Sequence, residues 1–174
     1  MRTRVLKHLR RLCLLAFAAG LPACTISYRF NGASIDYSAI HAISIADFPN
    51  RAALVYPPLS ANLSEAVRDL YARQTRLEIL REGGQLEIEG AIVGYSLTPM
   101  AVAADSYAAE TKLTLTVTVH FTNNVVPEES FDKTYTAYQT FDASRLLNDV
   151  QEELCNTMIT EIAESIFNDT VAKW

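Results

Sequence analysis

Residues 112–122 read KLTLTVTVHFT, and this stretch decides the fold. Apolar and polar side chains alternate along it without a break. Because successive side chains of a β-strand point to opposite faces of a sheet, the alternation predicts a strand with one face in an apolar core. The apolar set is Leu113, Leu115, Val117, Val119 and Phe121, and the other set is Thr114, Thr116, Thr118, His120 and Thr122. We expect the threonine-rich face to point toward solvent or a partner.

A neighbouring strand is predicted over residues 131–141, because the alternation returns after the connection at residues 123–129. Side by side, the two strands would present hydroxyl groups in a regular array. The candidate docking residues in this array are Thr114, Thr116, Thr118, Thr134, Thr136 and Tyr138. Threonine is also a good strand former on a solvated face, so the sequence leaves docking and simple strand propensity equally open.

Two helices are predicted from apolar residues at helical spacing. The first begins at Pro57-Pro58, since proline is favourable in a first helical turn. Its apolar residues are Leu59, Leu63, Ala66, Val67, Leu70 and Tyr71. The second covers residues 144–171, with Asp142 or Ser144 as its N-cap. Its apolar stripe is Leu147, Val150, Leu154, Met158, Ile162 and Ile166.

The remaining strands are predicted over residues 25–32, 40–48, 77–82 and 85–99. Gly83-Gly84 separates the last two and is expected to turn a hairpin between them. This order of elements favours an α+β fold. We expect a two-layer sandwich in which two α-helices pack on one face of a mixed, mostly antiparallel sheet.

The N-terminal segment has the pattern of a bacterial lipoprotein signal. Five basic residues precede an apolar run over residues 12–23, which is too short to cross a hydrocarbon core of about 30 Å. Leu21-Pro22-Ala23-Cys24 resembles the lipobox, in which cleavage precedes the cysteine and the cysteine is acylated. We therefore expect residues 1–23 to be a signal peptide, Cys24 to be the lipid attachment site, and residues 24–174 to form a single domain.

The residues before Cys24 are basic, whereas the rest of the chain, which we call the body, is acidic. The whole chain has a formal charge of −5, but five of its 15 basic residues precede Cys24, which leaves 10 basic and 20 acidic residues after it. A net charge of −10 excludes general nucleic-acid binding, which requires clustered Lys and Arg. The basic residues Arg68, Arg73, Arg76 and Arg81 either form a solvated helix face paired with nearby carboxylates or bind an anionic lipid.

No catalytic pattern is present in the body of the chain. His41 and His120 stand alone, and Glu87 and Glu89 read as exposed carboxylates of a strand. Cys155 has apolar neighbours and is expected to be a buried residue that packs like a small hydrophobe. No metal-ligand spacing, nucleophile motif or phosphate-binding loop occurs, so the sequence implies no metal and no cofactor, and an enzyme is the least favoured class.

A resemblance to a known family extends over about 150 residues. Its motifs are Cys24 with residues 28–35, Ile43-Ser44-Ile45 with Phe48-Pro49-Asn50, Pro57-Pro58-Leu59-Ser60, residues 89–95, 113–123 and 166–168, and Trp174. In these segments and their order the chain resembles the lipopolysaccharide-assembly lipoprotein family LptE in its Bacteroidetes form.

This resemblance implies a non-enzymatic lipoprotein that needs no cofactor. It implies that the protein plugs the lumen of the outer-membrane barrel LptD, supports assembly of that barrel, and serves lipopolysaccharide transport to the outer leaflet. Lipopolysaccharide is a less favoured direct ligand, because the body is acidic. The expected location is the periplasmic face of the outer membrane, with acyl chains as the membrane contact. A periplasmic lipoprotein that binds a ligand in a groove remains the alternative.

Overall fold

The computed structural model describes residues 35–100 and 109–172, which all fall in one compact unit, Gly32–Trp174. The expected strand at residues 25–32 lies outside the described residues. The described elements, in chain order, are β1 (Ala42–Ile45), α2 (Pro58–Gln74), β2 (Glu78–Leu80), β3 (Leu86–Pro99), β4 (Glu110–Asn123), the short 3-10 helix η1 (Pro127–Glu129), β5 (Phe131–Asp142) and α3 (Leu147–Thr170).

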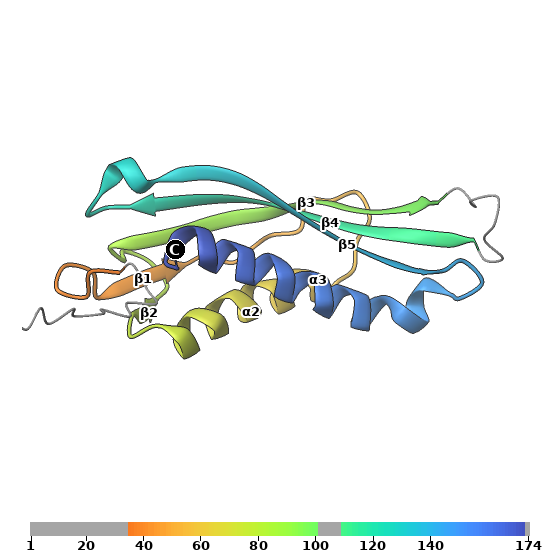
Figure 1. Cartoon of the computed structure of the whole chain (residues 1–174), viewed down its shortest axis with the longest axis horizontal. Helices are drawn as coiled ribbons and strands as arrows, with labels where there is room; N and C mark the ends of the chain where they lie inside the picture. Colours follow the sequence, from red (N-terminus) through yellow and green to blue (C-terminus); the bar gives the residue numbers. More distant parts are fainter. Residues whose placement is uncertain (1–34, 101–108, 173–174) are drawn as a thin grey trace, which may run out of the picture. The chain divides into compact units, whose positions relative to one another are not determined.

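The five strands form one open sheet in the order β2-β1-β3-β4-β5, with both helices on the same face (Figure 1). β1 is parallel to both of its neighbours, β2 and β3, whereas β4 is antiparallel to both of its neighbours, β3 and β5. The sheet is therefore mixed, and its three long strands are antiparallel. This confirms the predicted α+β fold with two helices packed on one face.

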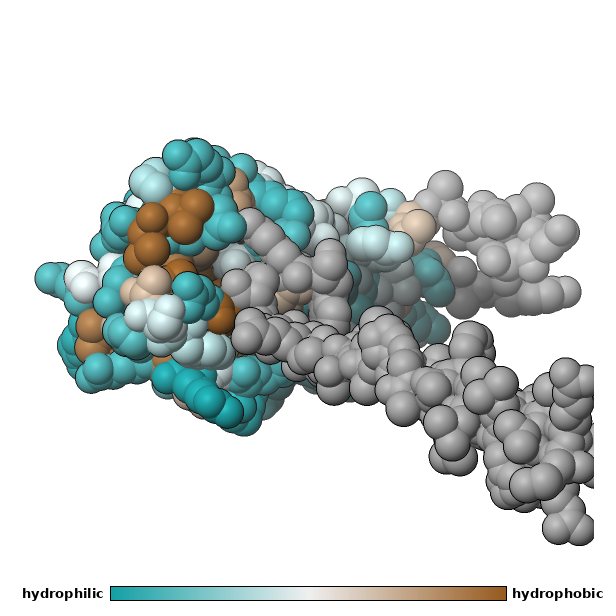
Figure 2. All heavy atoms as spheres, turned by 60° about the vertical axis from the view of Figure 1, so that its left-hand side comes forward, coloured by the Kyte–Doolittle hydropathy of each residue, from teal (hydrophilic) through white to brown (hydrophobic). Residues whose placement is uncertain are grey.

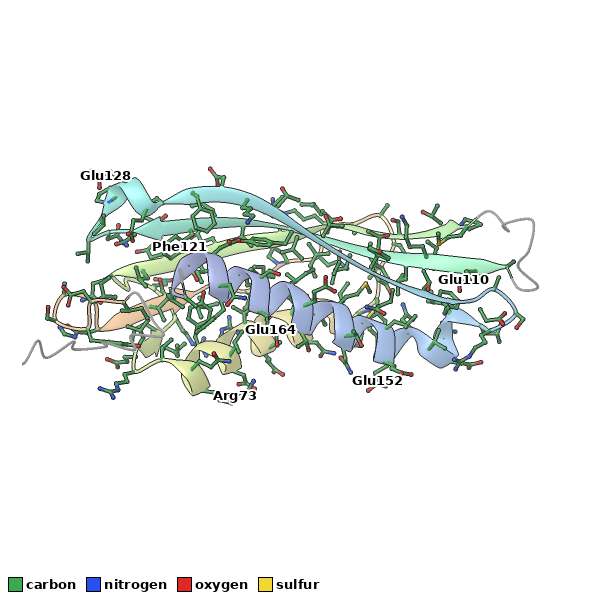
Figure 3. All side chains as sticks on the ribbon, in the orientation of Figure 1. Arg73, Glu110, Phe121, Glu128, Glu152 and Glu164 are labelled. Carbon is green, nitrogen blue, oxygen red and sulfur yellow. The ribbon has the colours of Figure 1, made fainter. Side chains whose placement is uncertain are left out.

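The core lies between the sheet and the helices, as the alternation in residues 112–122 predicts. Leu113, Leu115, Val117, Val119 and Phe121 of β4 are all buried. α3 covers β4 and β5 with Met158, Ile162 and Ile166, which are also buried. Burial of side chains of this size stabilises the fold by about 1.5–3 kcal/mol each, measured against full exposure. Arg73 and Glu152 point away from the sheet (Figure 3).

The two helices also contact each other. Tyr71 of α2 is fully buried and hydrogen-bonds through its hydroxyl to Thr170 of α3. Its ring meets Phe167 edge to face, with ring centroids 5.1 Å apart. Burial raises the pKa of Tyr71. The prediction for α2 is confirmed except at one position, because Ser64 is buried and Ala66 is only half-buried.

Ser64 is buried because it binds the chain that leaves β1. The backbone N–H of Phe48 donates to Ser64 Oγ over 3.0 Å, and Ser60 Oγ donates to the carbonyl of Phe48 over 2.6 Å. Phe48 is fully buried beside them. α2 thus pairs both the backbone N–H and the backbone C=O of the buried Phe48. The strand β1 is shorter than predicted and is buried on both faces.

The predicted hairpin at Gly83-Gly84 is wrong. β2 and β3 do not pair with each other, because β1 lies between them and is parallel to both. The connection crosses over β1, and Gly84 lies against the β1 backbone: a Cβ atom there would stand 2.5 Å from the nitrogen of Ser44 and 2.8 Å from the carbonyl carbon of Ile43. Gly83, with φ +76°, makes the turn that leads into this crossing.

The predicted cap of the C-terminal helix is also wrong. The N-cap of α3 is Leu146, which has no capping side chain. Asp142 instead accepts a hydrogen bond from the backbone N–H of Ser144 over 2.8 Å. This local turn follows β5, so the Asp142 carboxylate accepts a hydrogen bond from the turn and not from the N-terminal N–H groups of α3.

Candidate functional site

The threonine face is the side of the sheet opposite the helices. We define it by the six docking residues predicted from the sequence, which are Thr114, Thr116, Thr118, Thr134, Thr136 and Tyr138. The β4–β5 register places Thr114 opposite Tyr138, Thr116 opposite Thr136, and Thr118 opposite Thr134. Three successive rows of hydroxyl groups therefore cross the two strands. The three β4 threonines are half-buried, and the β5 residues are exposed.

Some of these hydroxyls already form hydrogen bonds within the sheet, but each can still form others. Thr136 Oγ1 donates to Thr116 Oγ1 over 3.3 Å, and Thr118 Oγ1 donates to the carbonyl of Ala91 over 3.4 Å. Each threonine hydroxyl carries one donor and two acceptor sites. Tyr138 is 59% exposed, and Lys112 Nζ lies 5.5 Å from the centre of its ring. The face can therefore offer both donors and acceptors to a partner.

Strand β3 widens the face by three small residues that sequence reasoning did not assign to it. Ala91, Gly94 and Ser96 lie opposite Thr118, Thr116 and Thr114. A β-bulge between Ile92 and Gly94 interrupts the alternation of β3, which hid this pattern in the sequence. The interior of the face is consequently uncharged across three strands.

Charged residues begin where the rows of hydroxyls end. His120 Nδ1 and Asp132 Oδ1 are 2.6 Å apart, and His120 Nε2 lies 3.2 Å from the hydroxyl of Thr122. His120 and Asp132 line a shallow cavity of about 460 Å³ together with Arg51 and Glu89. At the other end Lys112 follows Thr114 on the same face. The threonine face is thus a neutral band between two charged borders.

The four arginines predicted as candidates do not form one basic patch. Arg68 Nη2 donates to Asp47 over 2.6 Å and to the carbonyl of Ile45 over 3.1 Å. This hydrogen bond and the charge of Arg68 lower the pKa of Asp47. Arg68 and Arg81 share a cavity of about 540 Å³, which Asp47 and Glu82 also line.

Arg73 and Arg76 lie apart from that cavity. Arg73 is paired with Asp69, one helical turn earlier, at 3.7 Å, and Arg76 is exposed after the end of α2. Arg73 is therefore an exposed residue with a carboxylate partner on its own helix. The Glu65 and Glu78 partners envisaged for this group form no ion pair with it within the described ranges.

The other residues considered for chemistry in the sequence, Cys155, His41 and Glu87, have the surroundings of ordinary core or surface residues. Cys155 is fully buried, and its Sγ lies 3.4 Å from the hydroxyl of Tyr95, which also accepts a hydrogen bond from Gln151 over 2.7 Å. Burial raises the pKa of Cys155, so its thiolate is disfavoured. His41 is exposed at the start of β1, and Glu87 binds Asn124 over 3.0 Å.

Neither a metal-type cluster of side chains nor a helix able to cross a bilayer is found in the part of the chain that the structure describes. Residues 35–100 and 109–172 contain no group of three or more His, Cys, Asp or Glu side chains placed to hold a metal ion. No helix in these ranges combines the length and apolar character needed to cross a bilayer. Cys24, the predicted lipid attachment site, lies outside the described residues.

The surface at the end of the sheet that carries β1 and β2 is largely hydrophilic, with a few small hydrophobic areas (Figure 2). The two cavities are each lined by a mixture of charged and uncharged residues. Neither is the deep apolar groove that a ligand-binding module would require.

The solved structures to which this chain is similar have low sequence identity to it. A hypothetical protein from Chlamydia trachomatis aligns with a TM-score of 0.52 and 9% identity over 75% of this chain and 98% of its own. A minor lipoprotein from Acinetobacter baumannii has a TM-score of 0.48 and 13% identity, covering 72% and 89%. Rare lipoprotein B from Shewanella oneidensis has a TM-score of 0.48 and 12% identity, covering 71% and 91%.

No curated protein matches the chain. A family model does: LptE, described as lipopolysaccharide-assembly, matches residues 40–170 and so spans every described helix and strand. The match includes the threonine face and both helices. The chain therefore belongs to the LptE family of lipopolysaccharide-assembly lipoproteins.

Proposed function

We propose that this protein docks its threonine face against the lumen of an LptD-type outer-membrane β-barrel. In this role it plugs the barrel, supports the assembly of the barrel, and serves lipopolysaccharide transport to the outer leaflet. Acyl chains on Cys24 hold the protein on the periplasmic leaflet of the outer membrane. Two or more such chains suffice for stable anchoring.

The observation that carries the proposal is the neutral band of hydroxyls between charged borders. The interior of an outer-membrane barrel is polar. Hydroxyl groups can exchange water for hydrogen bonds to such a wall, whereas buried unpaired charges would lose several kcal/mol on leaving water. A broad surface of Thr, Ser and Tyr therefore suits a close contact with a polar wall.

The helical side of the domain is a poorer docking surface. Its exposed residues on α3 include Glu152, Glu153, Glu161 and Glu164. Desolvating several like charges at once is costly. This contrast between the two sides favours the sheet as the side that meets the barrel.

Direct lipopolysaccharide binding through the arginines is not part of this proposal. Arg68 is already paired with Asp47, and Arg81 shares its cavity with two carboxylates. Phosphate groups of a lipid would have to displace or overcome these anions. The barrel is thus the proposed primary partner, and lipopolysaccharide is its cargo.

Replacement of Thr116 or Thr136 by Lys tests the docking face. Each variant places one charge in the neutral band, and we expect at least tenfold less LptD-type barrel to co-purify from detergent extracts. Thr160→Lys, which adds the same charge to the exposed surface of α3, is the matched control and should retain the barrel. Circular dichroism checks that all three variants fold.

The same variants are then expressed as the sole copy in cells. We expect the two sheet variants to weaken the outer-membrane barrier to a bulky hydrophobic antibiotic, and Thr160→Lys to preserve it. Normal co-purification and a normal barrier in Thr116→Lys and Thr136→Lys would show that the threonine face is not the docking surface.

A further inference from the structure

The two edges of the sheet are protected very differently. β2, at one edge, has three residues, whereas β5, at the other, has twelve. Long edge strands are normally blunted by bulges, prolines or charges, because their free backbone groups can pair with another chain. The β4–β5 register is continuous, and residues 134–141 contain no charge, proline or glycine. The edge of β5 lacks the usual protection.

The register identifies which backbone groups face outward along β5. The N–H of Ala143 donates to the carbonyl of Ala109 over 2.9 Å, in continuation of the β4–β5 pairing. In an antiparallel ladder such hydrogen-bonded pairs recur at every second residue. Odd-numbered residues of β5 therefore bond to β4. The N–H and C=O groups of Thr134, Thr136, Tyr138 and Thr140 point away from it.

A hydrogen bond between β3 and β4 supports this assignment of inward-facing and outward-facing backbone groups. The N–H of Met100 donates to the carbonyl of Glu110 over 2.8 Å, so even-numbered residues of β4 bond to β3 and odd-numbered ones bond to β5. No strand among the described residues pairs with the outer edge of β5, since β5 ends the sheet. Four consecutive outward residues leave eight backbone groups for another strand.

The side chains beside this edge fit an added strand on both faces. On one face, Thr134, Thr136 and Tyr138 belong to the threonine face. On the other face, Phe131, Gln139 and Phe141 are only half-buried although they lie on the side of the core. A strand next to β5 would extend the polar face and cover these residues. It should therefore alternate polar and apolar side chains.

We propose that the β5 edge binds an extended segment of the barrel partner by β-strand addition, in which four to five residues of that segment extend the sheet. This inference rests on the proposed function, because the outward residues Thr134, Thr136 and Tyr138 also belong to the docking face. Continuity of face and edge favours one partner for both. A second copy of the chain is disfavoured, since each body carries a net charge of −10 and two would repel.

Hydrogen exchange with single-residue readout tests the edge directly, on the isolated protein and on its complex with the LptD-type barrel. In the isolated protein the amides of Thr134, Thr136, Tyr138 and Thr140 should exchange at least about 100-fold faster than those of Tyr135 and Ala137, which bond to β4. In the complex the four fast amides should slow by at least about tenfold. An unchanged alternation in the complex would overturn the proposal.

Two variants at one position provide a second test. Thr136→Pro removes one outward N–H, at an edge where proline can be accommodated, and should weaken barrel binding. Thr136→Val also removes the hydroxyl but keeps that N–H and the β-branched shape, so it is the reference variant, and Thr136→Pro should bind the barrel about threefold to tenfold more weakly than it does. Equal binding by both variants would contradict strand addition. If Thr136→Pro does not fold, the exchange experiment still decides.

The outcomes separate this inference from the proposed function. Loss of binding in Thr116→Lys, with no effect of Thr136→Pro and no new amide protection, would retain face docking and refute strand addition. Failure of every form of the chain to bind the barrel would refute both. Protection of the four amides that rises with the concentration of the isolated protein would identify a second copy as the occupant and overturn the proposal.

Discussion

Replacing Gly84 by Ala should destabilise the protein more than its small size change suggests. Gly84 lies where the β2–β3 connection crosses β1. The added Cβ would stand 2.5 Å from the nitrogen of Ser44, 2.7 Å from the carbonyl oxygen of Leu86 and 2.8 Å from the carbonyl carbon of Ile43. All three atoms belong to the backbone, so no side chain can rotate away.

The magnitude follows from these contacts. Ordinary contact to a carbon atom begins near 3.4 Å, so β1 or the crossing segment must move by roughly 0.5–1 Å. Overpacking of this kind typically costs about 1–3 kcal/mol, and here the moving atoms carry the β1 ladders. We expect the free energy of unfolding to fall by about 2–3 kcal/mol, which corresponds to a decrease in Tm of roughly 4–12 °C.

Urea unfolding followed by circular dichroism measures this loss, with Gly83→Ala as the matched control. A Cβ at Gly83 meets no atom within 4 Å, and only its positive φ of +76° opposes alanine. That strain costs about 1–2 kcal/mol. Gly84→Ala should therefore shift the urea midpoint further than Gly83→Ala. An equal or smaller shift for Gly84→Ala would refute the crossing as the reason for glycine.

Two further predictions concern the anchor and the acid titration. Cys24→Ala should remove the acyl chains and release the protein into the soluble periplasmic fraction, as followed by fractionation and mass spectrometry; a variant that stays acylated in the outer membrane would contradict the assignment. Arg68→Met should return the lowered pKa of Asp47 toward its ordinary value, as followed by NMR titration. Because that pKa is lowered in the folded state, the stabilisation from this pair is present at neutral pH and is lost as pH falls from the ordinary pKa of an aspartate through the folded value. Equal Asp47 titrations in both proteins would show that Arg68 is not the cause.

The parts of the fold that the sequence predicted are those with a strong local period. The alternation from Leu113 to Phe121 is visible without any knowledge of neighbours, because one side of β4 faces the core and the other faces solvent. The helices are equally visible, apart from Ser64, whose burial depends on its hydrogen bond to the Phe48 backbone. Long-range partners of that kind leave no trace in a local pattern.

The connection at Gly83-Gly84 was predicted wrongly for the same reason. Two glycines between two strands are typical of a hairpin, and nothing near them reveals that β1, some 40 residues earlier, lies between the strands. The threonine rows of β4 and β5 were predictable from their spacing. The contribution of β3 was not predictable, because the bulge between Ile92 and Gly94 changes which of its side chains point to each face of the sheet.

The position of β1 also determines how the domain bears mechanical load. The chain enters β1 from its N-terminal side, and β1 is held on both sides by parallel ladders, to β2 and to β3. Tension applied through the preceding segment acts along the strand axis, so it shears all of these hydrogen bonds together rather than opening them one at a time. The buried Phe48, bound through its backbone by Ser60 and Ser64, adds a second hold just beyond the strand. Tension from the N-terminal side of β1 is thus resisted by both parallel ladders and by the hydrogen bonds to Phe48.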